Sequence, residues 1–475
     1  MPLTLAQLEQ IRGDNFADDV PIDALNLEEM SRWSAEEAAE YFASGGTRRP
    51  PSQSVPASGE VEAHAEAGLG RLSVDDTARV SELKAKGNAE LKSGNTELAV
   101  ATYRQALELC NPSHADLPAL HSNVAQALLK LDRAEEALAS AEECIFASPE
   151  WHKSHYRKGD ALFALRQYDG AARSYESALR LRPSEAEISR ALALAREAAA
   201  GGLWLRALLP GRDIALSPAS ADERLLFGAA HSMKNLVYLV GDLASRECYA
   251  VDACWDVRGV AAIAAGHKMR LVGAIATHYH FDHAGGAVPP HFVAMIAGPM
   301  HRGDVLLPGL REMGRDYGAK LYCHSAERER LAIQCRLGVD ELHALDKGAR
   351  LPLGDARHIE VLHTPGHSAG SVCLCVRERA PPTAGAAGAA GAADKASAVL
   401  AGDTLFPGSC GRLDLPDSDV DAMFDSLQTL RALPDATPVY PGHAYSGERT
   451  TIGQEKRAGL LRDFSRQQWA AMHGG

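Results

Sequence analysis

Apolar and small residues follow a helical pattern in the first half of the chain and form short strand-like runs in the second. Gly159 stands 34 residues after Ala125, prolines at the same separation close the two copies, and Gly87 begins an earlier copy. Small residues let paired helices approach closely, and a period of this length is typical of stacked helix pairs. Residues 76–200 are therefore predicted to form three helical repeats and a final helix, enough to bury a continuous core.

The second half of the pattern predicts a layered α/β domain over residues 205–475. Runs at 236–240, 249–251 and 271–275 are short, apolar and bounded by turn residues, as strands are. Helical patterns alternate with these runs, and this alternation favours helices packed on sheets. A low-complexity stretch rich in alanine and glycine, residues 380–397, is predicted to be a surface loop between two strands.

Composition and charge narrow the range of partners. The 475 residues include 49 lysines and arginines against 62 aspartates and glutamates, and the formal net charge of −13 argues against nucleic acid as a partner. No apolar run reaches membrane-spanning length, so no membrane segment is predicted. Nine scattered cysteines without zinc-finger spacing indicate reduced thiols, and with the acid-rich start of the chain they favour a cytoplasmic protein. Residues 1–75 are expected to be an acidic, flexible region.

A dense group of metal-binding side chains follows the predicted strand at 271–275. His278, His280, Asp282 and His283 stand within six positions, and alternate residues of an extended segment point to the same side. Imidazoles and carboxylates are ligands of divalent cations such as zinc. The glycine pair that follows would let the backbone turn sharply into the next helix.

Three further candidate ligands each follow a predicted strand: His367, Asp403 and His443. Strand ends meet at one edge of a sheet, where α/β proteins place their sites. Five histidines and two aspartates would satisfy two divalent ions, with one carboxylate bridging them. Asp252 also ends a strand, and it is expected either to support the site from outside the ligand shell or to cap a helix.

This pattern resembles the metallo-β-lactamase superfamily from about residue 225 to 457. The resemblance implies an αββα fold with two metal sites and a bridging carboxylate: His278, His280 and His367 for one metal, Asp282, His283 and His443 for the other, and Asp403 between them. It also implies that Asp282 and Asp403 are catalytic. The implied cofactors are two divalent ions that activate water, Zn²⁺ first, with Fe or mixed Zn/Fe as alternatives.

Flanking residues resemble those of short glyoxalase-II-like hydrolases. They are Gly-Asp-Thr-Leu-Phe at 402–406, Gly-Arg-Leu-Asp at 411–414 and Thr-Thr-Ile-Gly-Gln-Glu at 450–455. The reaction that this resemblance implies is hydrolysis of an acylglutathione thioester, such as S-lactoylglutathione. A mononuclear iron persulfide dioxygenase shares the His/Asp motif and is the alternative enzyme.

The helical repeats carry a second candidate site. In register with Gly87, Ala125 and Gly159, the first helices of the repeats present five polar residues: Lys84, Asn88, Asn123, Lys153 and Arg157. These residues resemble the carboxylate clamp of tetratricopeptide domains that bind the Glu-Glu-Val-Asp C-termini of heat-shock chaperones. Lysine and arginine form charge-assisted hydrogen bonds with carboxylates, and asparagine amides orient the peptide.

Two hypotheses for the whole chain follow. In the first, a tetratricopeptide module that docks chaperone tails is fused to a dinuclear hydrolase of a small, glutathione-derived thioester. In the second, the chain is a co-chaperone or adaptor whose hydrolase domain is secondary or inactive. The complete set of seven ligands favours the enzyme.

Overall fold

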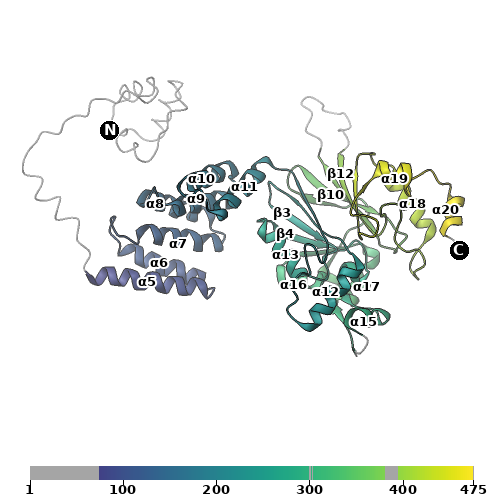
Figure 1. Ribbon diagram of the computed structural model, residues 1–475, viewed down its shortest axis with the longest axis horizontal. Helices are drawn as coiled ribbons and strands as arrows, with labels where there is room; N and C mark the ends of the chain where they lie inside the picture. The colour runs from purple at the N-terminus through teal and green to yellow at the C-terminus, as the bar shows by residue number, and fades with distance from the viewer. Residues whose placement is uncertain (1–73, 299–300, 302, 380–393, 474–475) are drawn as a thin grey trace, which may run out of the picture. The chain divides into compact units, whose positions relative to one another are not determined.

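The computed structural model describes residues 74–298, 301, 303–379 and 394–473 (Figure 1). The predicted flexible region 1–75 lies almost wholly outside these ranges, as does most of the predicted loop 380–397. The loop prediction was wrong at its end, because Lys395 and Ala396 pair with the preceding strand and belong to strand β12. Within the described ranges, no helix has the length and apolarity needed to cross a membrane.

Seven helices in the described part of the chain form the predicted all-α region. They are α5 (Val74–Lys92), α6 (Thr96–Glu108), α7 (Leu117–Lys130), α8 (Ala134–Ala147), α9 (His152–Ala164), α10 (Tyr168–Leu181) and α11 (Ala186–Ala200). Consecutive helices pack on one another (Figure 1). Gly87 stands 38 residues before Ala125, four more than the 34-residue period, and the extra residues fall in the connection between α6 and α7.

Glycine allows the paired helices of the first and third repeats to touch. A Cβ atom on Gly87 would lie 2.5 Å from the ring of Tyr103, and one on Gly159 would lie 2.5 Å from the ring of Tyr175. Both tyrosines are fully buried. The small residues of the repeat are thus explained by the ring that packs against each of them, because a larger side chain would separate the helices.

Two six-stranded mixed sheets form the second part of the described chain. The first has the order β1-β2-β3-β4-β7-β8, and the second has the order β14-β13-β12-β11-β10-β9. The strands of the first sheet are β1 (Leu203–Leu208), β2 (Val237–Asp242), β3 (Glu247–Val251), β4 (Arg270–Ile275), β7 (Lys320–Cys323) and β8 (Leu342–Ala344). Those of the second are β9 (Arg350–Leu353), β10 (Arg357–His363), β11 (Val372–Glu378), β12 (Lys395–Gly402), β13 (Pro438–Pro441) and β14 (Thr450–Thr451).

The sheets face each other across one apolar core and are covered by helices on their outer faces. Tyr238 and Val251 of the first sheet and Ile359 and Leu374 of the second belong to the same buried cluster. Helices α13 (Val257–Gly266), α16 (Leu310–Tyr317) and α17 (Arg328–Cys335) cover the first sheet, and α18 (Val420–Arg431), α19 (Ile452–Ala458) and α20 (Arg466–His473) cover the second (Figure 1). The predicted layered α/β domain is therefore confirmed as an αββα arrangement.

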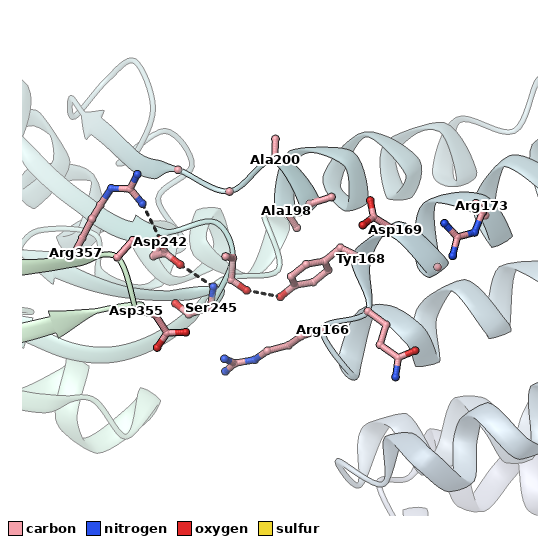
Figure 2. A pocket seen from close by; sticks show the side chains of 17 residues that line it. Arg166, Tyr168, Asp169, Arg173, Ala198, Ala200, Asp242, Ser245, Asp355 and Arg357 are labelled. Atoms are coloured by element: carbon pink, nitrogen blue, oxygen red, sulfur yellow. Dashed lines mark hydrogen bonds and ion pairs between the residues drawn. The ribbon is translucent and has the colours of Figure 1, made fainter. Parts of the chain in front are cut away.

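The last repeat contacts the first sheet through polar and aromatic side chains. The Tyr168 hydroxyl donates a hydrogen bond to the Ala244 carbonyl at 2.7 Å, and Lys268 Nζ lies 4.5 Å from the centre of the Phe163 ring. Figure 2 shows the cavity of about 800 Å³ beside Tyr168, with Arg173 on the repeat side and Arg357 on the sheet side. None of the predicted site residues lines this cavity.

Candidate metal centre

The segment after β4 positions the first four candidate ligands. His278 Nε2 lies 3.0 Å from His280 Nδ1, and Asp282 and His283 lie in a one-turn helix, α14 (Phe281–Ala284). The glycine pair, Gly285 and Gly286, has φ values of +76° and +87° and does turn the chain sharply. The predicted helix, α15 (Pro290–Ala297), follows only after strand β5 (Gly286–Ala287), which pairs with β6 (Leu306–Leu307).

The other three candidate ligands come from the second sheet. His367 follows β10, Asp403 directly follows β12, and His443 follows β13. His367 Nε2 lies 2.9 Å from His280 Nδ1, and His443 Nε2 lies 3.1 Å from His283 Nε2. The fold therefore brings together side chains that are up to 165 positions apart in the sequence. All of them are buried except His280, which is half-buried.

Glycine at the strand ends makes this close approach possible. A Cβ atom on Gly442 would lie 2.4 Å from Asp403 Oδ1 and 2.9 Å from the His283 ring. Gly402, which precedes Asp403, has a φ of +48°, a backbone conformation that favours glycine. Larger residues at either position would push the carboxylate and the imidazoles apart.

The donor atoms form three overlapping groups, each with its atoms within 4.8 Å of one another. The groups are His278, His280 and His367; His278, His283 and Asp403; and Asp282, His283 and His443. The first and third groups are the two ligand sets that the family resemblance implies. Asp403 lies between these two sets, with one oxygen 3.5 Å from His367 Nε2 and the other 3.4 Å from His283 Nε2. Metal ligation by these residues stays a prediction.

Hydrogen bonds outside the cluster orient the imidazoles. The Nδ1 atom of His283 faces Asp252 at 2.9 Å, that of His367 faces the Arg412 carbonyl at 2.9 Å, and that of His443 faces the Met233 carbonyl at 2.8 Å. Each Nδ1–H donates to its oxygen, so each Nε2 points to the centre. His367 Nε2 and His280 Nδ1 face each other at 2.9 Å, and a cation between them could be bound by both nitrogens.

The charges of the cluster also fit a bound cation. Burial lowers the pKa of His278 well below its usual range and that of His280 to about 4, with neighbouring histidines adding to both effects, so both rings are neutral. Burial would raise the pKa of Asp282, but the nearby His283 and His443 lower it to about 2. Burial would likewise lower the pKa of His283, yet three carboxylates raise it to about 10. The centre therefore attracts positive charge.

One oxygen in the centre has no hydrogen bond. Asp403 Oδ1 is buried and lacks a hydrogen-bond partner among the described residues. A buried carboxylate oxygen without a hydrogen bond is costly unless a cation or a donor satisfies it. The residues present thus fit divalent ions by donor type, donor spacing and charge.

Asp252 supports the centre, and Asp256 is the residue that caps the following helix. The carboxylate of Asp252 accepts hydrogen bonds from the Thr277 amide and hydroxyl, both at 2.8 Å, as well as from His283. The cap of α13 is Asp256, whose side chain accepts from the Gly259 amide. Of the two roles predicted for Asp252, the structure therefore supports the one outside the ligand shell and not the helix cap.

Sequence reasoning missed two residues around the centre. The Asn235 amide donates to Asp282 Oδ2 at 3.1 Å and accepts from the Trp255 indole at 3.2 Å. Tyr445, whose side chain is half exposed, stacks on the His443 ring with 4.6 Å between ring centres. An asparagine directly before the apolar run 236–240 is the signal that could have revealed Asn235, whereas nothing in the sequence pattern distinguishes Tyr445.

The five predicted clamp residues lie on α5, α7 and α9, the first helices of the three repeats. Asn123 Nδ2 donates to Asn88 Oδ1 at 3.0 Å, which joins the first two of these helices. Lys84 is ion-paired with Asp116, and Arg157 is paired with Asp160 at 3.1 Å. The structure therefore brings the two asparagines together, while two of the three cations already have acidic partners within the chain.

Comparison with known proteins matches both regions. Residues 237–443 match the metallo-beta-lactamase superfamily, and residues 84–150 and 152–185 match tetratricopeptide repeats. The probable polyketide biosynthesis zinc-dependent hydrolase PksB of Bacillus subtilis is 25% identical over 214 residues, which cover 44% of this chain and 73% of that relative. A hydroxyacylglutathione hydrolase from a Synechococcus strain is 29% identical over 213 residues, 45% of this chain and 65% of that relative.

The repeats have relatives of their own. The Hsp70-Hsp90 organizing protein of Triticum aestivum is 38% identical over 119 residues, which cover 25% of this chain and 20% of that relative. The chain thus spans about two thirds of the Synechococcus hydrolase and about one fifth of the organizing protein. The matches nevertheless identify both parts of the fusion: tetratricopeptide repeats are followed by a domain of the metallo-β-lactamase superfamily.

Proposed function

We propose that the C-terminal domain is a dinuclear metal-dependent hydrolase that cleaves a small thioester, with a hydroxyacylglutathione as the first substrate to test. The observation that carries the proposal is the meeting of five imidazoles and two carboxylates in one buried cluster. The relatives named as a zinc-dependent hydrolase and as hydroxyacylglutathione hydrolases support the reaction class. Zinc is the proposed metal, with iron or a mixed pair as the alternatives.

The proposed reaction is addition of water to the thioester carbonyl and loss of the thiolate. Two divalent ions at these ligands would lower the pKa of a shared water to near neutrality and polarise the carbonyl oxygen. The chain contributes fixed geometry, because Asp252 orients His283 and the Arg412 carbonyl orients His367. Asp282 and Asp403 remain ionised, since neighbouring histidines lower the pKa of both carboxyls against the effect of burial. These carboxylates balance the positive charge and accept hydrogen bonds from the attacking water.

Metal analysis together with a substrate assay tests this proposal. We expect about two zinc ions per chain and release of glutathione from S-lactoylglutathione. One iron per chain with oxygen consumption on glutathione persulfide would instead identify a dioxygenase. A protein that contains two metals but hydrolyses no thioester would favour the adaptor hypothesis.

We also propose that the tetratricopeptide repeats dock the acidic C-terminal tails of heat-shock chaperones. The support is the register of Lys84, Asn88, Asn123, Lys153 and Arg157 on the first helices, together with the relationship to an Hsp70-Hsp90 organizing protein. A peptide carboxylate would exchange with Asp116 and Asp160 for the two paired cations. Lys153 has no ion pair in the described residues and is the cation that is open to a ligand.

Peptide binding to the full chain tests the docking proposal. We expect a peptide that ends in Glu-Glu-Val-Asp to bind with a free C-terminal carboxylate and to lose affinity when that carboxylate is amidated. Equal affinity for the free and amidated peptides would contradict the clamp.

A cytoplasmic location is part of the same proposal. All nine cysteines are free, and those in the αββα domain are buried except for the half-buried Cys410. Burial raises the pKa of Cys410 to about 12, which keeps it protonated. Unpaired thiols are typical of proteins from reducing compartments.

A further inference from the structure

A small cavity of mixed charge lies beside the clamp. Helices α9 and α11 enclose about 330 Å³ there, with Lys153, Tyr156 and Arg157 on one wall and Glu185, Glu187 and Ile188 on the other. The two basic residues belong to the predicted clamp. The two glutamates do not, and they would repel an acidic peptide tail, so the docking of carboxylates leaves them unexplained.

The carboxylates of both glutamates can accept further hydrogen bonds. The Glu185 carboxylate makes no hydrogen bond or ion pair with any residue that the structure describes. Glu187 Oε1 accepts from the Tyr156 hydroxyl at 3.0 Å, whereas Arg157 bonds to Asp160 and not to either glutamate. Both glutamates are exposed, and Ile188 beneath them is buried. The cavity thus has an apolar floor and an anionic rim beside a cationic wall.

We propose that this cavity binds a basic side chain of the docked peptide, arginine above all, a few residues before the C-terminal carboxylates. This inference rests on the clamp proposed above and adds a rule for choosing among acidic tails. The Glu185 and Glu187 carboxylates would pair with the guanidinium, and its aliphatic stem would lie along Ile188 and the Tyr156 ring. Tails with a glutamate at this point would be disfavoured by like charge.

The spacing of the helices limits where in the peptide the basic residue lies. Packed helices are about 8–10 Å apart, and an extended peptide advances about 3.3 Å per residue. One helix-to-helix step therefore corresponds to about three residues. Because the clamp extends over three helices and α11 follows them, the basic residue is expected about three to six positions before the C-terminal residue.

An arginine scan on the full chain tests the proposal. Peptides ending in Glu-Glu-Val-Asp, with alanine upstream, would receive one arginine at a time from the third to the sixth position before the C-terminal residue. At the fourth to sixth positions the arginine replaces an alanine and the Glu-Glu-Val-Asp ending stays intact. At the third position it replaces the first glutamate of that ending. We expect arginine at one position to tighten binding about fivefold over the unsubstituted peptide, the upper range for an exposed ion pair, and glutamate there to weaken it.

The matched variants decide whether the glutamates cause the gain. In the Glu185→Gln/Glu187→Gln double variant the arginine gain should disappear, while the alanine peptide still binds. Glu108→Gln removes one negative charge from the exposed side of α6, away from the cavity, and should leave the gain unchanged. An arginine gain that is equal in the wild type and the double variant would overturn the proposal, because it would reflect only the net charge of −13. Failure of every peptide to bind would overturn the clamp itself, so the two failures are distinguishable.

Discussion

The metal centre and the clamp both gather charged side chains, but they satisfy them in opposite ways. In the metal centre, the Asp252, Asp282 and Asp403 side chains are at most 9% exposed and converge on one imidazole, His283. In the clamp, Lys84 and Arg157 each pair with an acidic residue of the same chain, and these side chains are 14–28% exposed. The metal centre has an excess of negative charge, whereas two of the three cations of the clamp already have acidic partners.

This difference in charge and burial indicates how each site would select a ligand. Buried charge is expensive, so a cluster with excess carboxylates strongly favours a cation. Ion pairs that solvent reaches contribute far less, about 0.2–1 kcal/mol each when fully exposed, so a peptide carboxylate can replace the half-buried pairs of the clamp at a smaller cost. We therefore expect tight, permanent binding at the metal centre and reversible exchange at the clamp.

The largest expected effect comes from Asp403→Asn. The amide keeps the shape but loses the charge that lies between the two ligand sets. We expect bound metal, measured by elemental analysis, to fall below two ions per chain. Thioester hydrolysis should fall by more than the roughly 100-fold that marks the upper end for outer-shell changes. Asp355→Asn, in the exposed turn between β9 and β10, is the matched control. Full metal content in the Asp403 variant would contradict its assigned place.

Asp252→Asn should have the next largest effect. This carboxylate orients His283 and binds the Thr277 amide and hydroxyl without belonging to any of the three donor groups. Outer-shell changes of this kind cost about 10–100-fold in metal affinity. Competition with a chelator measures the change, and an affinity equal to that of the wild type would show that backbone packing alone orients His283.

Changes in the clamp should weaken peptide binding and leave the metal in place. A charge-assisted hydrogen bond contributes about 1.5–3 kcal/mol, so Lys153→Ala and Arg157→Ala are each expected to raise the Kd about 10–100-fold. Lys158→Ala is a control on the same helix, because Lys158 pairs with Glu142 of α8 at 3.0 Å. Calorimetry with the Glu-Glu-Val-Asp peptide gives the Kd. Clamp variants that bind as tightly as the control would refute the docking site.

The smallest and most discriminating effect is expected from Asp116→Asn. Removing this carboxylate frees Lys84, and the peptide no longer has to displace an intrachain partner. Because an ion pair that solvent reaches is weak, binding should tighten by only about twofold to fivefold. A weaker affinity in this variant would mean that Asp116 holds Lys84 in position for the peptide and does not compete with it.

Much of the architecture could be predicted because it depends on local regularities. The 34-residue spacing of Ala125 and Gly159 reflects the need for a small residue wherever two helices of a repeat touch. The seven candidate ligands could be found because all of them lie shortly after predicted strands: four follow one strand, and each of the other three follows a strand of its own. The end of a strand can be recognised in the sequence as a break in a short apolar run. The repeat spacing and the candidate ligands can thus be recognised from residue type and position along the chain.

The partners of those residues depended on the tertiary structure. Asn235 donates to Asp282 and is itself held by Trp255, and Asp116 reaches Lys84 from 32 positions away. The sequence left Asp252 with two possible roles, and its contact with His283 decided between them. Periodicity reports which face a side chain occupies within its own helix or strand, whereas these contacts join elements that are distant in sequence. Only the packing of the sheets and the stacking of the repeats brings such side chains within hydrogen-bonding distance.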